Sequence, residues 1–176
     1  MHKDVKEILY SHEDIIAKCK EWAQRINEDY KDKEVMLIGL LKGSVPFLAE
    51  LSKYIELDVT FDYMDVSSYD GAQSRNIVIK KDVDEDVKGK EILLVEDILD
   101  TGKTLSTVQA MFLEKGAKSV EIVTLLDKKE GRKVQIEAKY AGYEIPNAFV
   151  VGFGLDFNEK YRNLPYVGIL KEEMYK

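Results

Sequence analysis

The stretch that most constrains the fold runs from Ile92 to Leu105 and reads ILLVEDILDTGKTL. It begins as a continuous apolar run and then places three carboxylates, Glu96, Asp97 and Asp100, within five positions. A continuous apolar run bounded by polar residues is typical of a strand that is buried on both faces. The small, hydroxyl-rich turn that follows leads into an amphipathic segment, as at the start of a helix. The stretch therefore predicts a buried strand, a loop and a helix start.

The rest of the chain repeats this alternation of strands and helices. Ser11 and Asp14 have the spacing of a capping box, and apolar residues recur at helical spacing after them. Alternating strands and helices predict an α/β fold, a mainly parallel sheet flanked by helices and joined by right-handed crossovers. We expect one domain, residues 1–176. Strands are expected at 35–41, 57–66, 77–79, 92–95, 119–126, 148–153 and 166–170. Helices are expected from the cap at Ser11 through Ile26, at 46–54 and at 104–113.

Composition excludes several classes of function. A formal net charge of −7 disfavours nucleic-acid binding, which needs a basic surface to displace counterions. No apolar run approaches the roughly 20 residues of a membrane helix. The single cysteine, Cys19, cannot form an intramolecular disulfide, and the first residues carry no apolar signal segment, so we expect a cytoplasmic protein. Because Cys19 lies on the apolar helix face with Trp22, we interpret it as a core residue.

Gly102, Lys103 and Thr104 after a strand suggest the phosphate-binding loop of nucleoside triphosphatases. That pattern requires a glycine five positions before Gly102, where this chain has Asp97, so a triphosphatase fits poorly. Carboxylates suit ribose hydroxyls and a hard cation, whereas backbone N–H groups at a helix start suit one phosphate. A phosphorylated ribose meets both requirements. The alternative is a solvated acidic turn, but carboxylates at the carboxyl edge of an open sheet lie where ligands bind.

The segment 94–104 resembles the phosphoribosyl-pyrophosphate motif of the type I phosphoribosyltransferases. Further segments make the chain similar to the hypoxanthine-guanine phosphoribosyltransferases, in order from about Val35 onward. The resemblance implies a Rossmann-like fold with a small hood. It also implies purine salvage, in which the 5-phosphoribosyl group of phosphoribosyl pyrophosphate passes to hypoxanthine or guanine to form IMP or GMP and pyrophosphate. The further segments are Leu41–Ser44, Ser67–Tyr69, Leu125–Lys128, Phe149–Gly152, Leu155–Glu159 and Tyr161–Arg162.

The resemblance implies which residues bind the phosphoribosyl donor. Asp100 matches the catalytic residue, a general base toward purine N7. Lys42, Gly43 and Arg162 match the pyrophosphate contacts, with a cis peptide between Leu41 and Lys42. The phosphoribosyl-binding residues are Glu96, Asp97, Asp100, Thr101, Gly102, Lys103 and Thr104.

The resemblance also implies the purine site, the metal and a closing loop. A mobile loop that includes Ser67, Ser68 and Tyr69 would cover the site. The cofactor is Mg²⁺, held by Glu96, Asp97 and Asp156. The purine-binding residues are Lys128, Phe149, Val150 and Asp156.

Two rival functions stay open at this stage. One is a nucleotide-sensing regulator that uses the same fold to bind RNA or DNA, although this acidic chain lacks the basic surface that such a protein needs. The other is an enzyme of the same type that prefers xanthine. For the enzyme, we expect small-molecule substrates, phosphoribosyl pyrophosphate and 6-oxopurines, and no nucleic-acid or membrane partner. Apolar surface on the first helices leads us to expect a homodimer or homotetramer.

Overall fold

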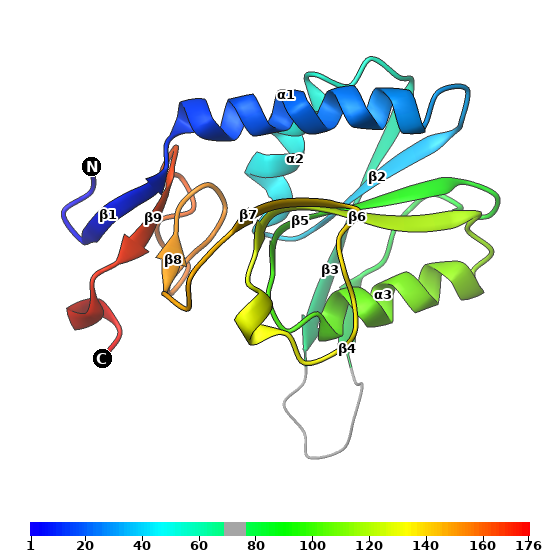
Figure 1. Cartoon of the computed structure of the whole chain (residues 1–176). Coiled ribbons are helices and arrows are strands. Elements are labelled where there is room, and N and C mark those ends of the chain that lie inside the picture. The colour runs from blue at the N-terminus through cyan, green and yellow to red at the C-terminus, as the bar shows by residue number, and fades with distance from the viewer. Residues whose placement is uncertain (69–76) are drawn as a thin grey trace.

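The computed structural model of the protein describes residues 1–68 and 77–176, and these form two sheets and their covering helices (Figure 1). The larger sheet has the strand order β4-β3-β2-β5-β6-β7. Its strands are β2 (Val35–Leu40), β3 (Val59–Ser68), β4 (Ile77–Lys81), β5 (Glu91–Leu99), β6 (Ser119–Asp127) and β7 (Tyr140–Glu144). The smaller sheet, which we call the hood, contains β1 (Val5–Tyr10), β9 (Val167–Leu170) and β8 (Val150–Val151) in that order.

The larger sheet confirms the predicted parallel architecture. Strands β3, β2, β5, β6 and β7 are parallel, and β4 pairs antiparallel with β3 at one edge. Helices α1 (His12–Asp29) and α2 (Ser44–Ser52) cover one face, and α3 (Lys103–Glu114) covers the other (Figure 1). The crossover β2-α2-β3 moves toward one edge and β5-α3-β6 toward the other. The strand order therefore reverses between β2 and β5.

Alternation along the central strands explains why both faces are covered. In β2, Val35 and Leu37 pack into the cluster with α1 and α2, whereas Met36 and Ile38 pack into the cluster with α3. Successive side chains of a strand point to opposite faces, so an uninterrupted apolar strand requires an apolar layer on each side. The sequence pattern of β2 therefore specifies a three-layer arrangement.

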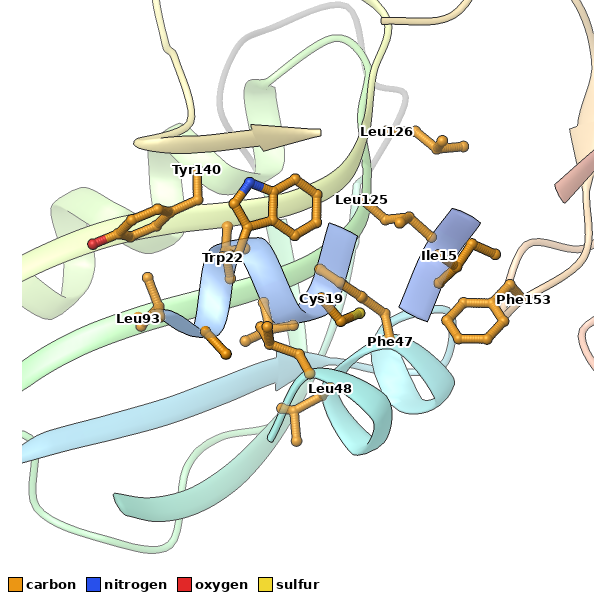
Figure 2. Close-up of a cluster of buried hydrophobic side chains, with 14 of the residues drawn as sticks. Ile15, Cys19, Trp22, Phe47, Leu48, Leu93, Leu125, Leu126, Tyr140 and Phe153 are labelled. Carbon is orange, nitrogen blue, oxygen red and sulfur yellow. The ribbon is translucent and has the colours of Figure 1, made fainter. Parts of the chain in front are cut away.

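Helix α1 begins where the sequence predicts. Its capping box is complete: the Ser11 hydroxyl accepts the Asp14 backbone N–H at 3.2 Å, and Asp14 accepts the Ser11 N–H at 2.8 Å. Figure 2 shows Cys19 and Trp22 on the face of α1 that meets Phe47 of α2, and Cys19 is fully buried. The interpretation of Cys19 as a core residue is confirmed.

Several predicted boundaries were wrong for local reasons. The helix expected to open at Pro46 starts at Ser44, because proline is tolerated within the first turn, where its missing N–H costs no hydrogen bond. Strand β5 continues to Leu99 and includes Glu96 and Asp97, which were expected in the loop after it.

The strand assignments near the chain ends also changed. The segments expected at 148–153 and 166–170 do form strands, β8 and β9, but they belong to the hood rather than to the larger sheet. Strands β1 and β7 were missed because each carries mostly exposed and half-buried residues and so shows no continuous apolar run. Within residues 1–68 and 77–176, no helix is long and apolar enough to cross a membrane.

Candidate active site

A cavity of about 460 Å³ opens at the carboxyl ends of β2 and β5, where the strand order reverses. In open α/β sheets this point leaves a crevice between loops that depart in opposite directions, and ligands bind there. Four segments line the cavity: the loop after β2, the end of β3, the end of β5 and the turn that leads into α3. Arg162, from the loop between β8 and β9, completes the lining. The lining consists of residues 40–43, 66–67 and 96–102, Thr104, Leu105 and Arg162.

Most of the residues predicted to bind the phosphoribosyl donor meet at this cavity. The residues brought together are Lys42, Gly43, Ser67, Glu96, Asp97, Asp100, Thr101, Gly102, Thr104 and Arg162. Lys103 is the first residue of α3 and does not line the cavity. The four residues predicted to bind the purine, Lys128, Phe149, Val150 and Asp156, also lie outside the lining. Ser68 ends β3, and Tyr69 falls outside the described residues, as does most of the expected mobile loop.

Glu96 and Asp97 form an adjacent pair of acidic groups at the end of β5. The Asp97 backbone N–H donates to Glu96 Oε1 at 3.2 Å, and the Ile98 N–H donates to Asp97 Oδ1 at 2.8 Å. Burial raises the pKa of Glu96 well above its usual range, and the neighbouring Asp97 carboxylate raises it further. Burial also raises the pKa of Asp97. Two desolvated carboxylates side by side would be stabilised by a cation.

The oxygen donors of this pair fit a magnesium ion. Mg²⁺ prefers carboxylate oxygens and commonly takes one or two of them together with substrate phosphates and water. Within residues 1–68 and 77–176, no three Asp, Glu, His or Cys side chains gather in a metal-binding cluster. Glu96 and Asp97 therefore offer the carboxylate oxygens that Mg²⁺ prefers, and its other ligands would come from bound phosphates and water.

The start of α3 presents backbone N–H groups to the same cavity. Gly102 is the N-cap residue of this helix, with φ of 78°, a left-handed conformation that favours glycine, and the Lys103 backbone N–H donates to the Thr101 hydroxyl at 3.4 Å. A Cβ at Gly102 would lie 2.4 Å from Ile136 Cγ2, so a larger residue would also collide. The N–H groups of a helix's first turn and the helix dipole attract an anion such as a phosphate.

The loop after β2 lies directly against the acidic pair. The Leu41–Lys42 peptide is cis. A Cβ added to Gly43 would lie 1.9 Å from Asp97 Oδ2, so the backbone of the loop contacts the carboxylate where a side chain would stand. The Gly43 carbonyl oxygen in turn lies 1.9 Å from where a Cβ of Gly154 would be. Gly43 is thus packed between the end of β5 and the loop between β8 and β9, which contains Gly154.

Arg162 connects the hood to this loop. Its guanidinium donates to the Gly154 carbonyl at 2.7 Å and pairs with Asp156 at 3.0 Å and Glu159 at 3.1 Å. Glu159 also pairs with Lys42, at 2.6 Å. The two cations predicted to bind pyrophosphate are therefore joined through one carboxylate.

The four predicted purine residues lie on separate segments outside the cavity lining. Phe149 is 38% exposed, and its ring stacks on Tyr175 with centroids 5.1 Å apart and meets Phe157 edge-on at 5.4 Å. Val150 is buried in β8, where it pairs with Ile169. The Lys128 backbone N–H donates to the Leu99 carbonyl at 3.0 Å, which brings the loop after β6 to the end of β5.

Sequence reasoning missed three residues in contact with these groups. Glu159 lies within a segment quoted for the resemblance, Arg132 lies in a charged loop, and Tyr175 is next to the last residue. Arg132 stands in a loop rich in charged residues, which is typical of solvent-exposed positions, so the sequence around it does not indicate a role in the site. Tyr175 contacts Phe149 across 26 positions of sequence, which no local pattern reveals.

Comparison with known proteins agrees with this geometry. The family described as phosphoribosyl transferase domain matches residues 5–158. A protein from Streptococcus thermophilus (strain CNRZ 1066), named hypoxanthine-guanine phosphoribosyltransferase, is 52% identical over 99% of this chain and 98% of its own length. A crystal structure of a hypoxanthine phosphoribosyltransferase from Staphylococcus aureus is 47% identical, with a TM-score of 0.97, and the match covers 100% of this chain and 97% of that one.

A second solved structure extends the comparison. A hypoxanthine-guanine phosphoribosyltransferase from Bacillus anthracis is 41% identical, with a TM-score of 0.89, over 95% of this chain and 98% of that one. Both the sequence match and the structural matches span nearly the whole chain. The chain therefore belongs to the phosphoribosyl transferase domain family.

Proposed function

We propose that this protein transfers the 5-phosphoribosyl group from phosphoribosyl pyrophosphate to hypoxanthine or guanine, forming IMP or GMP and releasing pyrophosphate. The observation that carries the proposal is the cavity at the reversal of strand order, where the acidic pair of β5, the start of α3 and the cations Lys42 and Arg162 meet. A ligand that carries a ribose, a phosphate and a pyrophosphate matches the acidic pair, the helix start and the cations, respectively. The full-length relatives that carry this enzyme name support the same activity.

The three surfaces assign three binding tasks. The 5′-phosphate binds the N–H groups at the start of α3 with the hydroxyls of Thr101 and Thr104, and Gly102 and Lys103 contribute backbone groups to the same turn. Glu96 and Asp97 accept hydrogen bonds from the ribose hydroxyls and also favour positive charge that develops on the sugar ring.

Departure of pyrophosphate requires positive charge on the opposite side of the cavity. Lys42 and Arg162 provide it, and the backbone N–H of Gly43 adds a donor. Glu96 and Asp97 would hold a Mg²⁺ ion, and Asp156 would contribute to a second one. When bound, Mg²⁺ supplies positive charge that offsets the charge of the leaving group.

The predicted purine residues orient the base. Phe149 stacks on the ring through its exposed area, and the backbone of Val150 faces the purine edge. The ammonium of Lys128 donates to the 6-oxygen, which selects 6-oxopurines over adenine because an amino group cannot accept that bond. Asp100 takes the proton from N7 as the general base.

The remaining assignments extend this proposal. Residues 1–176 act as one phosphoribosyltransferase domain, because β1 near the N-terminus pairs with β9 near the C-terminus in the hood. Ser67 lines the cavity, and the closing loop predicted for Ser67, Ser68 and Tyr69 continues from there into residues outside the described part of the chain.

The assembly and the compartment stay predictions. We retain the prediction of a homodimer or homotetramer, although Val45 is the one large apolar residue strongly exposed on α1 and α2. Phosphoribosyl pyrophosphate and 6-oxopurines are the expected small-molecule partners, and the cytoplasm remains the predicted compartment.

The decisive experiment compares initial rates with hypoxanthine, guanine, xanthine and adenine in the presence of phosphoribosyl pyrophosphate and Mg²⁺. Rapid formation of IMP and GMP, with no product from adenine, is the expected result. A higher rate with xanthine than with either other oxopurine would favour the xanthine enzyme instead. Absence of nucleotide with every base would refute the proposal, and salt-sensitive retardation of RNA or DNA in a gel would then favour the regulator.

A further inference from the structure

We propose that Arg132 is a positioning residue that holds the end of β5, with Asp100, in register with the loop that carries Lys128. The inference rests on the proposed function, because Asp100 and Lys128 are the groups assigned to the purine there. Arg132 does not line the 460 Å³ cavity, so it would act through these residues rather than on the substrate.

The contacts of Arg132 join three segments of the chain. Nε donates to the Asp100 carbonyl at 2.9 Å, and Nη2 donates to the Leu99 carbonyl at 3.3 Å and to Asp127 Oδ1. Nη1 donates to the Ile136 carbonyl. A guanidinium has five N–H donors in a rigid planar fork and can satisfy such a set of acceptors at once, which a lysine ammonium on a flexible stem cannot.

The same two loops also meet through their backbones. The Lys128 N–H donates to the Leu99 carbonyl at 3.0 Å, and the Lys133 N–H donates to the Thr101 carbonyl at 3.0 Å. A Cβ at Gly131 would lie 1.7 Å from Asp100 Oδ1, so the Asp100 carboxylate rests on the backbone of the purine loop. Arg132 thus completes a junction in which Asp100, the predicted general base, contacts the loop that carries Lys128, the cation predicted to select the purine.

Arg132 also reaches the phosphate end of the site. Its Cδ lies 3.2 Å from where a Cβ of Gly102 would be, next to the residue that caps α3. Its side chain and that of Asp127 are 16% and 8% exposed. Removing the guanidinium would take one hydrogen bond from each of the Leu99 and Asp100 carbonyls and leave the Asp127 carboxylate buried without its partner. A shift of the β5 end would then move Asp100 and the start of α3 together.

The test uses Arg132→Met, Arg132→Lys and the double variant Arg132→Met/Asp127→Asn, which removes the ion pair without leaving an unpaired charge. Arg25→Met is the matched control, since Arg25 is exposed on α1 and its guanidinium lies over the Tyr140 ring at 5.2 Å. For Arg132→Met we expect kcat/KM for hypoxanthine to fall on the order of 10- to 100-fold, as for a small misplacement of reacting groups. Arg132→Lys should recover part of this loss, and Arg25→Met should match the wild type.

Two readouts separate positioning from general stability. Asp127→Asn in the Arg132→Met background should restore the melting temperature but not kcat/KM. In a double-mutant cycle, the loss of kcat/KM caused by Lys128→Met should shrink at least about threefold in the Arg132→Met background, because residues that act together are not additive. The same Lys128→Met loss should be unchanged in the Arg25→Met background.

The outcomes distinguish the two levels of the hypothesis. Wild-type kinetics for Arg132→Met, or losses at Arg132 and Lys128 that simply multiply, would overturn the positioning role while the proposed function stands. Recovery of both melting temperature and kcat/KM in the double variant would also overturn it. An inactive wild-type protein in the same assay would refute the proposed function and this inference with it.

Discussion

The ammonium of Lys42 and the carboxylate of Glu159 lie 2.6 Å apart, although 117 positions of sequence separate them. Lys42 follows β2 of the larger sheet, and Glu159 lies in the loop between β8 and β9 of the hood. Arg162 pairs with the same carboxylate at 3.1 Å. Both partners hold the pKa of Glu159 below its usual range, so Glu159 is ionised at neutral pH. It therefore forms ion pairs with the two cations proposed to bind pyrophosphate.

Glu159→Gln should therefore strengthen pyrophosphate binding. The Lys42–Glu159 pair is largely exposed, and exposed ion pairs are weak, so we expect the inhibition constant of pyrophosphate to fall only about two- to fivefold. Product-inhibition kinetics at low ionic strength measure this change. Glu21→Gln, which removes a similar carboxylate from the Lys18–Glu21 pair on α1, should have no effect. Weaker inhibition by pyrophosphate in Glu159→Gln would show that Glu159 organises the cations instead of competing for them.

Gly43→Ala should destabilise the protein through a collision with Asp97. The backbone at Gly43 has φ of −61° and ψ of −34°, which alanine adopts readily, so the cost is steric. Overpacking of this kind costs about 1–3 kcal/mol of unfolding free energy, measured by urea denaturation. Gly43→Ala/Asp97→Ala should recover that stability, because the truncated side chain at position 97 leaves room for the added methyl group. If the double variant stays as unstable as Gly43→Ala, the collision with Asp97 is not the cause.

Asp100→Ala should affect turnover rather than donor affinity. Loss of a general base lowers kcat by about 10²- to 10⁴-fold, whereas the Kd for phosphoribosyl pyrophosphate should change little. Glu96→Ala and Asp97→Ala should raise that Kd as well, because they remove contacts to the ribose and the Mg²⁺ site. For each of the three variants, calorimetric titration with phosphoribosyl pyrophosphate in the presence of Mg²⁺ measures the Kd, and steady-state kinetics measure kcat. Equal losses of affinity at all three positions would contradict separate roles.

Tyr175→Leu should weaken purine binding and leave the donor site intact. Tyr175 stacks on one side of Phe149, and aromatic pairs contribute about 0.5–1.5 kcal/mol beyond burial, so we expect KM for hypoxanthine to rise about two- to tenfold. KM for phosphoribosyl pyrophosphate should stay the same. Tyr54→Leu, in a half-buried tyrosine just after α2, is the control. A rise in the donor KM alone would place the effect of Tyr175 elsewhere.

Cys19 should be inert in the folded protein. Burial raises the pKa of its thiol to about 12, so at pH 8 the thiolate fraction is on the order of 10⁻⁴. A thiol reagent should react with the urea-unfolded chain and not with the native one. Since the unfolded thiol ionises near pH 8.5 but the folded one near 12, the Cys19 contribution to stability is full below about pH 8.5 and declines as pH rises above it. Rapid native labelling at pH 8 would contradict this burial.

The sequence by itself determined the layers and the principal acidic site. Continuous apolar strands, the capping box at Ser11 and the run from Ile92 to Leu105 are local signals, and hydrophobic periodicity alone assigns residues to faces of a sheet or helix. Hence the parallel sheet, helix α1, and the carboxylates Glu96 and Asp97 beside the start of α3 were predictable.

Only the tertiary structure decided which distant segments meet. The pairing of β1 with β9 joins opposite ends of the chain, and no short-range pattern encodes such a register. The same holds for Gly43 against Asp97, Glu159 on Lys42, Arg132 across the end of β5, and Tyr175 on Phe149. Each contact depends on side chains or backbones brought together by packing of the whole core, so the sequence can single out residues such as Asp97 and Phe149 but not the partners they meet.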